Sequence, residues 1–383
     1  GESTGWLSNP RVSPDGRSIA VWDHPERGDN AGRLVIYDVA RRTRTEGPTV
    51  GGTSSFTWSP QGFVAMGGGG IVQRVATSGK ARPWISLAGG FLPEDISPNG
   101  TMLAKRGNYR REIVGATGDA RERNLTWLDW SFPDDISVDG KAVLFDEQSG
   151  GRQNYLCYLR KMDGSPAVLL GEMKGYSLSP DGQWALTQSP DTHQLSLVPT
   201  GAGSPRVLSP SGLFYHWGFF LPDGKRILLW ANEAGHGGRL YVQEIEGGKP
   251  RPITPEGFGV SFGGRAISPD GRFVAATSPE RKIVICPIDG GPARPVPGAF
   301  ADEQAWGWTS DSRSLYIGKV EMPAKVEVCD IGTGARRLWK EIVPPDPAGV
   351  LAVGPIVITP DGKSYVYSYR RTLDDLFLVT GLK

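Results

Sequence analysis

The chain has 383 residues and a formal net charge of +1 at pH 7. A charge so close to zero, with no basic run, argues against a surface that attracts nucleic acid electrostatically. No apolar stretch approaches the roughly 18 residues that a membrane helix needs, so we expect no membrane insertion by this chain. The 53 glycines and 31 prolines recur at regular intervals, which favours a repeat-built fold over disorder.

A short turn motif recurs nine times along the chain. In its first copy, Ser13-Pro14-Asp15-Gly16, the proline presets φ and the glycine tolerates a positive φ, so the motif predicts a tight turn between two strands. Neighbouring copies lie 38 to 50 residues apart. About four short strands fit in each repeat of ~40 residues, which is typical of a β-propeller blade. The later copies begin at Ser59, Ser97, Ser137, Ser179, Leu221, Ser268, Thr309 and Thr359.

The strand before each turn has an apolar residue at the same place, two positions before the turn proline or its equivalent. One face of each first strand is therefore expected to be buried. We predict an all-β fold, a single β-propeller domain over residues 1–383 with nine four-stranded blades. Because nine exceeds the typical four to eight blades, eight blades plus an irregular hairpin is the alternative. The apolar residues are Val12, Trp58, Ile96, Ile136, Leu178, Phe220, Ile267, Trp308 and Ile358.

The two ends of the chain suggest how the ring closes. The ninth repeat reaches Lys383 without a fourth strand. An open blade would expose unpaired strand edges. We therefore expect the N-terminal segment before Asn9, including Trp6 and Leu7, to supply or border the missing strand.

Cysteine and histidine give little sign of metal or redox chemistry. Cys157, Cys286 and Cys329 fall in predicted third strands of different repeats, so we expect small buried side chains rather than a disulfide framework. None of the four histidines has a partner at metal-ligand spacing. We expect no metal and no cofactor.

Charged residues at the start of first strands give the candidate site. First strands line the channel of a propeller, so these residues are expected to ring one mouth. One interpretation is a polar pocket with an acidic side that binds a cation, an amine or a basic peptide end. The other is that the same residues cap strands, form ion pairs or hold channel water. The candidates are Arg11, Glu94, Asp95, Asp134, Asp135, His216 and Arg265.

The repeats resemble those of TolB-like, WD-repeat-related β-propellers. More narrowly, residues 4–14, 154–161 and 368–379 resemble the C-terminal propeller of acidobacterial eukaryotic-like serine/threonine protein kinases. In that bacterial family the kinase lies N-terminal and is commonly followed by a membrane helix. The resemblance therefore implies a sensor or interaction domain on the extracytoplasmic side of a membrane-anchored protein.

Two functions remain open. The first is a non-catalytic sensor or interaction propeller, which binds a small-molecule, peptide or protein ligand. The chain has no glycine-rich phosphate loop with its lysine, no His-Arg-Asp and no Asp-Phe-Gly, so it is not itself a kinase and we expect no enzyme activity. The second is a propeller enzyme or enzyme accessory domain, associated with a lyase or a peptidase, with its polar site at the channel mouth. We expect a soluble monomer.

Overall fold

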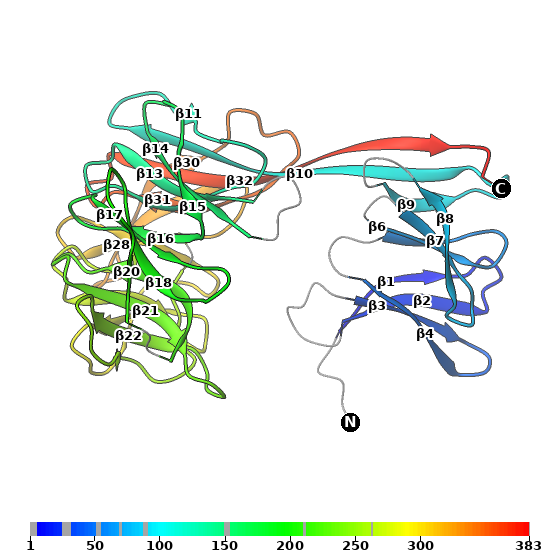
Figure 1. Cartoon of the computed structure of the whole chain (residues 1–383), viewed down its shortest axis with the longest axis horizontal. Helices are drawn as coiled ribbons and strands as arrows, with labels where there is room; N and C mark the ends of the chain where they lie inside the picture. The colour runs from blue at the N-terminus through cyan, green and yellow to red at the C-terminus, as the bar shows by residue number, and fades with distance from the viewer. Residues whose placement is uncertain are drawn as a thin grey trace. The chain divides into compact units, whose positions relative to one another are not determined.

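A computed structural model describes residues 6–24, 32–50, 55–68, 71–86, 91–148, 154–209, 212–261 and 263–382. These residues form strands, turns and loops, with no helix among them, and the strands belong to eight sheets (Figure 1). The chain has two compact parts, residues 1–109 with 372–383 and residues 110–371. The two parts are described separately below, and a single domain over the whole chain remains a prediction.

The first part contains two four-stranded sheets and a hairpin. Residues 20–75 supply a shared apolar core between the two sheets, in which Trp22 and Phe56 make an edge-to-face contact. The first sheet is β1 (Trp6–Val12), β2 (Ser18–His24), β3 (Gly32–Asp38) and β4 (Thr43–Val50). The second is β5 (Ser55–Trp58), β6 (Val64–Gly68), β7 (Ile71–Val75) and β8 (Ala81–Ser86), and β9 (Leu92–Ile96) pairs with the start of β10 (Met102–Thr117).

The second part contains six sheets. One joins segments that are distant in sequence, in the order β11 (Arg123–Asn124), β10, β32 (Ser364–Val379) and β31 (Val350–Ile358). Next along the chain are β12 (Ser131–Ile136), β13 (Ala142–Glu147), β14 (Leu156–Lys161) and β15 (Val168–Glu172), then β16 (Lys174–Leu178), β17 (Trp184–Gln188), β18 (Leu195–Pro199) and β19 (Arg206–Val207). The others are β20 (Phe214–Phe220), β21 (Arg226–Asn232), β22 (Arg239–Glu244) and β23 (Arg251–Pro252); β24 (Phe273–Thr277), β25 (Ile283–Pro287) and β26 (Arg294–Pro295); and β27 (Gln304–Trp308), β28 (Ser314–Gly318), β29 (Ala324–Asp330) and β30 (Arg336–Ile342).

Each of these six sheets packs face to face on the next, and the last packs on the first. Strand β31 contacts β12, β12 contacts β16, and β16 contacts β20. The third and fourth of these sheets share one apolar core with the β24–β26 sheet. That sheet packs on β27–β30, and β27 contacts β31. An all-β fold of four-stranded antiparallel sheets packed in this way is consistent with a β-propeller.

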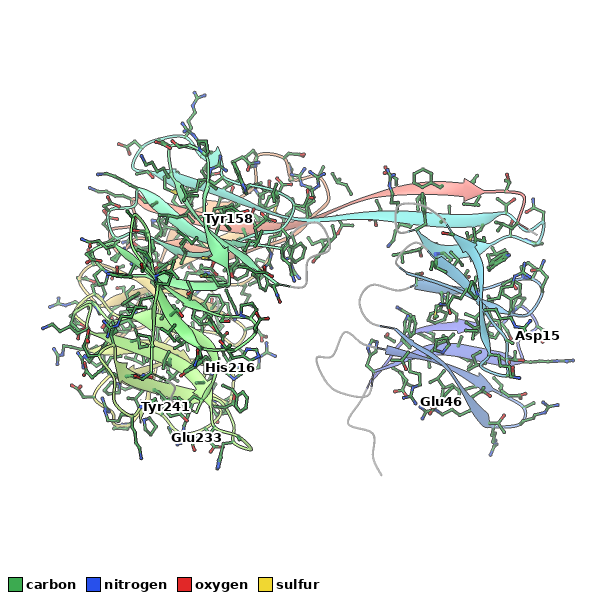
Figure 2. The ribbon with its side chains drawn as sticks, in the orientation of Figure 1. Asp15, Glu46, Tyr158, His216, Glu233 and Tyr241 are labelled. Atoms are coloured by element: carbon green, nitrogen blue, oxygen red, sulfur yellow. The ribbon has the colours of Figure 1, made fainter. Side chains whose placement is uncertain are left out.

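The recurrent motif forms the predicted turn. In its first copy, the Ser13 hydroxyl donates to Asp15 Oδ1 at 2.6 Å, and the N–H of Arg17 donates to the same oxygen at 3.0 Å (Figure 2). The N–H of Gly16 donates to the Ser13 carbonyl at 2.9 Å. In this copy the turn is held by a hydroxyl at the first position and an acceptor at the third. The copy at Leu221 has no hydroxyl but keeps the backbone bond from Gly224 to the Leu221 carbonyl. The same hydroxyl–carboxylate contact recurs at Ser137, Ser179, Ser268, Thr309 and Thr359.

Substituting the glycine in two copies of this turn distinguishes the cost of backbone strain from the cost of a steric clash. Both Gly140 and Gly182 have φ of 68°, but a Cβ on Gly140 would lie 2.2 Å from the buried Ser364 Oγ, whereas one on Gly182 would meet nothing within 4 Å. We expect Gly182→Ala to cost about 1–2 kcal/mol of unfolding free energy. Gly140→Ala should cost about 1–3 kcal/mol more, because Ser364 cannot move without repacking. Urea unfolding measures both, and equal losses would contradict the packing at Ser364.

Burial of the first strands agrees with the apolar pattern at most repeats. Seven of the nine marker residues are buried and Ile267 is half-buried, but Val12 is exposed. The cysteines also lie as predicted. All three are buried and free, on β14, β25 and β29.

Strand pairing differs from the predicted ring in two ways. The described strands form eight sheets rather than nine, because the ninth repeat (β31 and β32) joins β10 and β11 of the third repeat in one sheet. The described part of the N-terminal segment does not pair with the ninth repeat: Trp6, Leu7 and Ser8 pair with β2 inside the first sheet. The start of this segment, residues 1–5, lies outside the described residues. Strands β10 and β32 are each 16 residues long, so each has room for partners at both of its ends.

Candidate functional site

Two cavities lie at opposite ends of the first strands of residues 110–371. Early residues of these strands, such as Phe132, Lys174 and Trp217, line a cavity of about 410 Å³, here called the polar cavity. Later residues, together with the prolines of four turns, line a cavity of about 260 Å³, here called the turn-side cavity. The first strands therefore run from one cavity to the other.

The polar cavity combines aromatic walls with charged groups. Its volume falls within the range of small-molecule sites. Phe132, Trp217 and Trp306 contribute aromatic surface. The charged or titratable side chains in its lining are Arg111, Asp134, Asp146, Tyr155, Lys174 and Arg370.

A pair of buried carboxyl groups lies in the wall of this cavity. Asp134 and Asp146 are each 2% exposed. Burial raises the pKa of Asp134 well above its ordinary range, and the neighbouring Asp146 carboxylate raises it further. Burial raises the pKa of Asp146 to about 8, although the Gly175 N–H and the Lys174 ammonium oppose the rise. Two adjacent buried carboxylates repel each other, so each disfavours ionisation of the other.

The environment of the pair is built by the start of β16. Gly175 donates its N–H to Asp146 Oδ1 at 2.8 Å. A Cβ at Gly175 would lie 2.9 Å from Asp134 Oδ2 and 2.9 Å from Cys157 Sγ, so glycine allows the close approach. The Lys174 ammonium lies 4.7 Å from the centre of the Trp217 ring, and burial lowers the pKa of this lysine despite the nearby acids.

Two polar groups of the cavity have no partner in the described part of the chain. Neither oxygen of Asp134 receives a hydrogen bond from an N–H or hydroxyl donor. The half-buried guanidinium of Arg370 has no ion pair or hydrogen bond to any described residue. A buried acceptor and an unused donor in one cavity are features that a ligand can satisfy.

The turn-side cavity contains an ion pair rather than an open polar site. Arg265 Nε lies 3.3 Å from Asp135 Oδ1, and Asp135 also accepts from the N–H groups of Ile136 and Leu178. Burial raises the pKa of Asp135, and the Arg265 charge opposes the rise. Asp135 thus links neighbouring sheets.

The seven candidate residues do not all lie around one mouth of a channel. Asp134 lines the polar cavity, whereas Asp135 and Arg265 line the turn-side cavity. His216 lines neither; its Nε2 lies 2.8 Å from Asn232 Oδ1 and its ring packs near Trp230 (Figure 2).

The other three candidates lie in the first part of the chain. Glu94 Oε1 is 3.5 Å from Lys105 Nζ. Asp95 accepts the N–H of Ile96 at 2.8 Å, as Asp135 does from Ile136. Arg11 is exposed, and its carbonyl accepts the indole N–H of Trp58.

Sequence reasoning missed most of the polar cavity. Lys174 begins a first strand, so the rule that selected Asp134 applies to it as well. Asp146 lies on a second strand, where its neighbour across the sheet is Phe132, and only the strand register reveals this. Arg111 and Arg370 come from neighbouring strands of widely separated repeats, and no local pattern connects them.

Among the described residues, no group of three or more His, Cys, Asp or Glu side chains is placed to hold a metal ion. In the same residues, no helix is long and apolar enough to cross a membrane.

The carboxyl pair predicts an unusual pH dependence of stability. Folding takes up a proton wherever the folded pKa exceeds the ordinary one, so stability is lost as the pH rises from about 3.8 toward about 8. We expect Asp146→Asn to be more stable than the wild type at pH 8, with a difference that shrinks toward pH 4. Asparagine keeps an acceptor for Gly175 and offers an N–H to Asp134. Melting temperatures across this pH range test the prediction.

Asp181→Asn is a control that should change stability in the opposite direction. Hydrogen bonds from the Ser179 hydroxyl and the Gln183 N–H lower the pKa of Asp181. Its stabilising contribution is therefore present above the ordinary value of 3.8 and is lost as the pH falls further. Asp181→Asn should be less stable than the wild type at neutral pH. The carboxyl-pair assignment is wrong if Asp146→Asn behaves in the same way.

Comparison with known proteins extends to the fold alone. No protein-family model matches the chain, and no curated protein matches it. Solved structures that resemble it include TolB-like β-propeller proteins. One is a TolB-like protein from Agrobacterium tumefaciens (18% identity, TM-score 0.49, covering 69% of this chain and 99% of that one). Another is TolB from Acinetobacter baumannii (17% identity, TM-score 0.37, covering 77% of this chain and 66% of that one). An oligogalacturonate lyase in complex with manganese is also similar (16% identity, TM-score 0.43, covering 71% of this chain and 76% of that one). Likeness at this level does not indicate the function of this chain.

Proposed function

We propose that residues 110–371 form a six-bladed β-propeller that binds a small-molecule or peptide ligand in the polar cavity without converting it. The observation that carries the proposal is the cavity itself, where the acceptor of Asp134 and the guanidinium of Arg370 have no partner among the described residues. The circuit of packed sheets around the first strands supports a rigid scaffold for such a site.

Ligand titration tests this function. Trp217 and Trp306 line the cavity, so a bound ligand should change tryptophan emission. Organic acids, amines, sugars and short peptides would be titrated into the wild type and Asp134→Ala, and each bound compound recovered and weighed by mass spectrometry. We expect saturable binding that Asp134→Ala weakens, with the compound recovered unchanged. Binding that is insensitive to this substitution would contradict the assignment of the site.

A propeller enzyme or enzyme accessory domain is the second candidate. It is favoured by Asp134, because burial raises the pKa of this carboxyl group, and a raised carboxyl pKa is a property of general acids. Conversion of a bound compound in the same titration, lost in Asp134→Asn, would establish this alternative.

The wider context is part of the proposal. We propose that the chain is the sensor module of a bacterial receptor-like serine/threonine kinase, on the resemblance of residues 4–14, 154–161 and 368–379. The gene sequence upstream of Gly1 tests this directly. A kinase domain followed by an apolar stretch of about 20 residues would support an extracytoplasmic sensor. A hydrolase domain there would contradict it. Light scattering would test the proposed monomer.

A further inference from the structure

The polar cavity contains one cation that no carboxylate balances. Lys174 lies close enough to the buried Asp134 and Asp146 for their charges to act on its pKa. Arg370 has no ion pair with a described residue, so its positive charge faces the cavity without an acidic partner there. An enclosed cation of this kind attracts an anion and disfavours an amine.

The two arginines lie on one wall and differ in their surroundings. Arg111 is on β10 and Arg370 on β32, neighbouring strands of one sheet. The Arg111 guanidinium stacks 4.7 Å from the centre of the Phe132 ring, which fixes its plane. Arg370 has no hydrogen bond or ion pair to a described residue, so its donors are available to a carboxylate.

Asp134 adds a requirement for a donor on the ligand. Both of its oxygens are buried, and neither accepts a hydrogen bond from a donor in the described part of the chain. A ligand hydroxyl can satisfy this acceptor. An ammonium would meet the same acceptor but would also meet the neighbouring charge of Lys174.

We propose that the polar cavity binds a small hydroxy acid with an apolar or aromatic body. The carboxylate of this ligand lies against Arg370, its hydroxyl group donates to Asp134, and its body lies on the aromatic wall formed by Phe132, Trp217 and Trp306. The inference rests on the proposed binding function of this cavity and specifies the ligand class.

Three related probes test the class by isothermal titration calorimetry on the full chain. Phenyllactate has both the carboxylate and the hydroxyl, hydrocinnamate lacks the hydroxyl, and phenethylamine replaces the acid with an amine. We expect phenyllactate to bind most tightly and hydrocinnamate about tenfold more weakly. Phenethylamine should not bind measurably.

Two variants assign the contacts. Arg370→Gln should weaken both acids about tenfold or more, because an ionic hydrogen bond is lost. Asp134→Ala should remove the advantage of phenyllactate over hydrocinnamate. Arg337→Gln, an exposed arginine on β30, is the matched control and should change nothing.

Each other outcome has a distinct meaning. Preferential binding of phenethylamine, unaffected by Arg370→Gln, overturns the hydroxy-acid class while leaving a binding function in place. Equal affinity for the two acids overturns the role of Asp134. No saturable binding of any of the three probes at millimolar concentration overturns the hydroxy-acid inference, whereas the proposed binding function is tested separately by the wider titration of acids, amines, sugars and peptides.

Discussion

Trp308→Ala should lower the free energy of unfolding by about 3–5 kcal/mol. The side chain is 1% exposed, and its indole N–H donates to the Ala266 carbonyl at 2.8 Å. It belongs to the apolar core between the β24–β26 and β27–β30 sheets, together with Leu315 and Ile317. Truncation would leave a large cavity there and an unpaired carbonyl. Urea unfolding followed by far-ultraviolet circular dichroism measures the loss.

Two further variants separate the contribution of the hydrogen bond from that of packing. Trp308→Phe keeps most of the side-chain volume and loses the hydrogen bond, so we expect it to lower the free energy of unfolding by about 1–3 kcal/mol. Trp127→Ala removes a tryptophan that is 37% exposed in the same part of the chain, and it should cost less than Trp308→Ala. A loss at Trp127 as large as that at Trp308 would contradict the placement of Trp308 in the core.

Arg265→Met should destabilise the protein by about 3 kcal/mol, at the lower end of the range for breaking a buried ion pair. The Asp135 side chain is 7% exposed and Arg265 is 20% exposed, so removing the arginine leaves a carboxylate in a poorly solvated site. Asp135→Asn with Arg265→Met should be less destabilised than the sum of the single variants. Chemical denaturation of all four proteins completes the cycle.

The pH dependence of Arg265→Met separates lost charge from lost packing. Arg265 opposes the rise that burial causes in the Asp135 pKa, so its removal raises that pKa further. Protonation then relieves the unpaired charge, and the deficit relative to wild type should shrink as the pH falls. A deficit that stays constant with pH would assign the effect to packing alone.

The local features of the fold were predictable because they depend on short-range chemistry. The turn at Ser13 to Gly16 is specified by a hydroxyl, an acceptor and a residue that tolerates positive φ. The periodic apolar residues indicated the buried faces in the same way. Val12 is the exception because burial depends on the sheet that packs on a strand, and one strand's pattern does not contain that information.

The sheet that joins the third and ninth repeats and the lining of the polar cavity were not predictable, because both depend on pairing between strands that are distant in sequence. Nothing near β10 or β32 in sequence indicates that they are neighbours. Asp134 and Asp135 are adjacent in sequence and seemed to share one mouth. The register of β12 against β13 shifts between Pro133 and Asp135, and the two carboxyl groups line different cavities.

The sheet that combines β10 and β11 with β31 and β32 has a consequence for biosynthesis. Its first two strands leave the ribosome more than two hundred residues before the last two. Contacts of such long sequence separation form slowly, since loop closure precedes their stabilisation. During translation, the β12–β15 sheet therefore has no β31 to pack against, and Arg370 is not yet available to the polar cavity. The polar cavity is consequently completed late in synthesis, once the ninth repeat has left the ribosome.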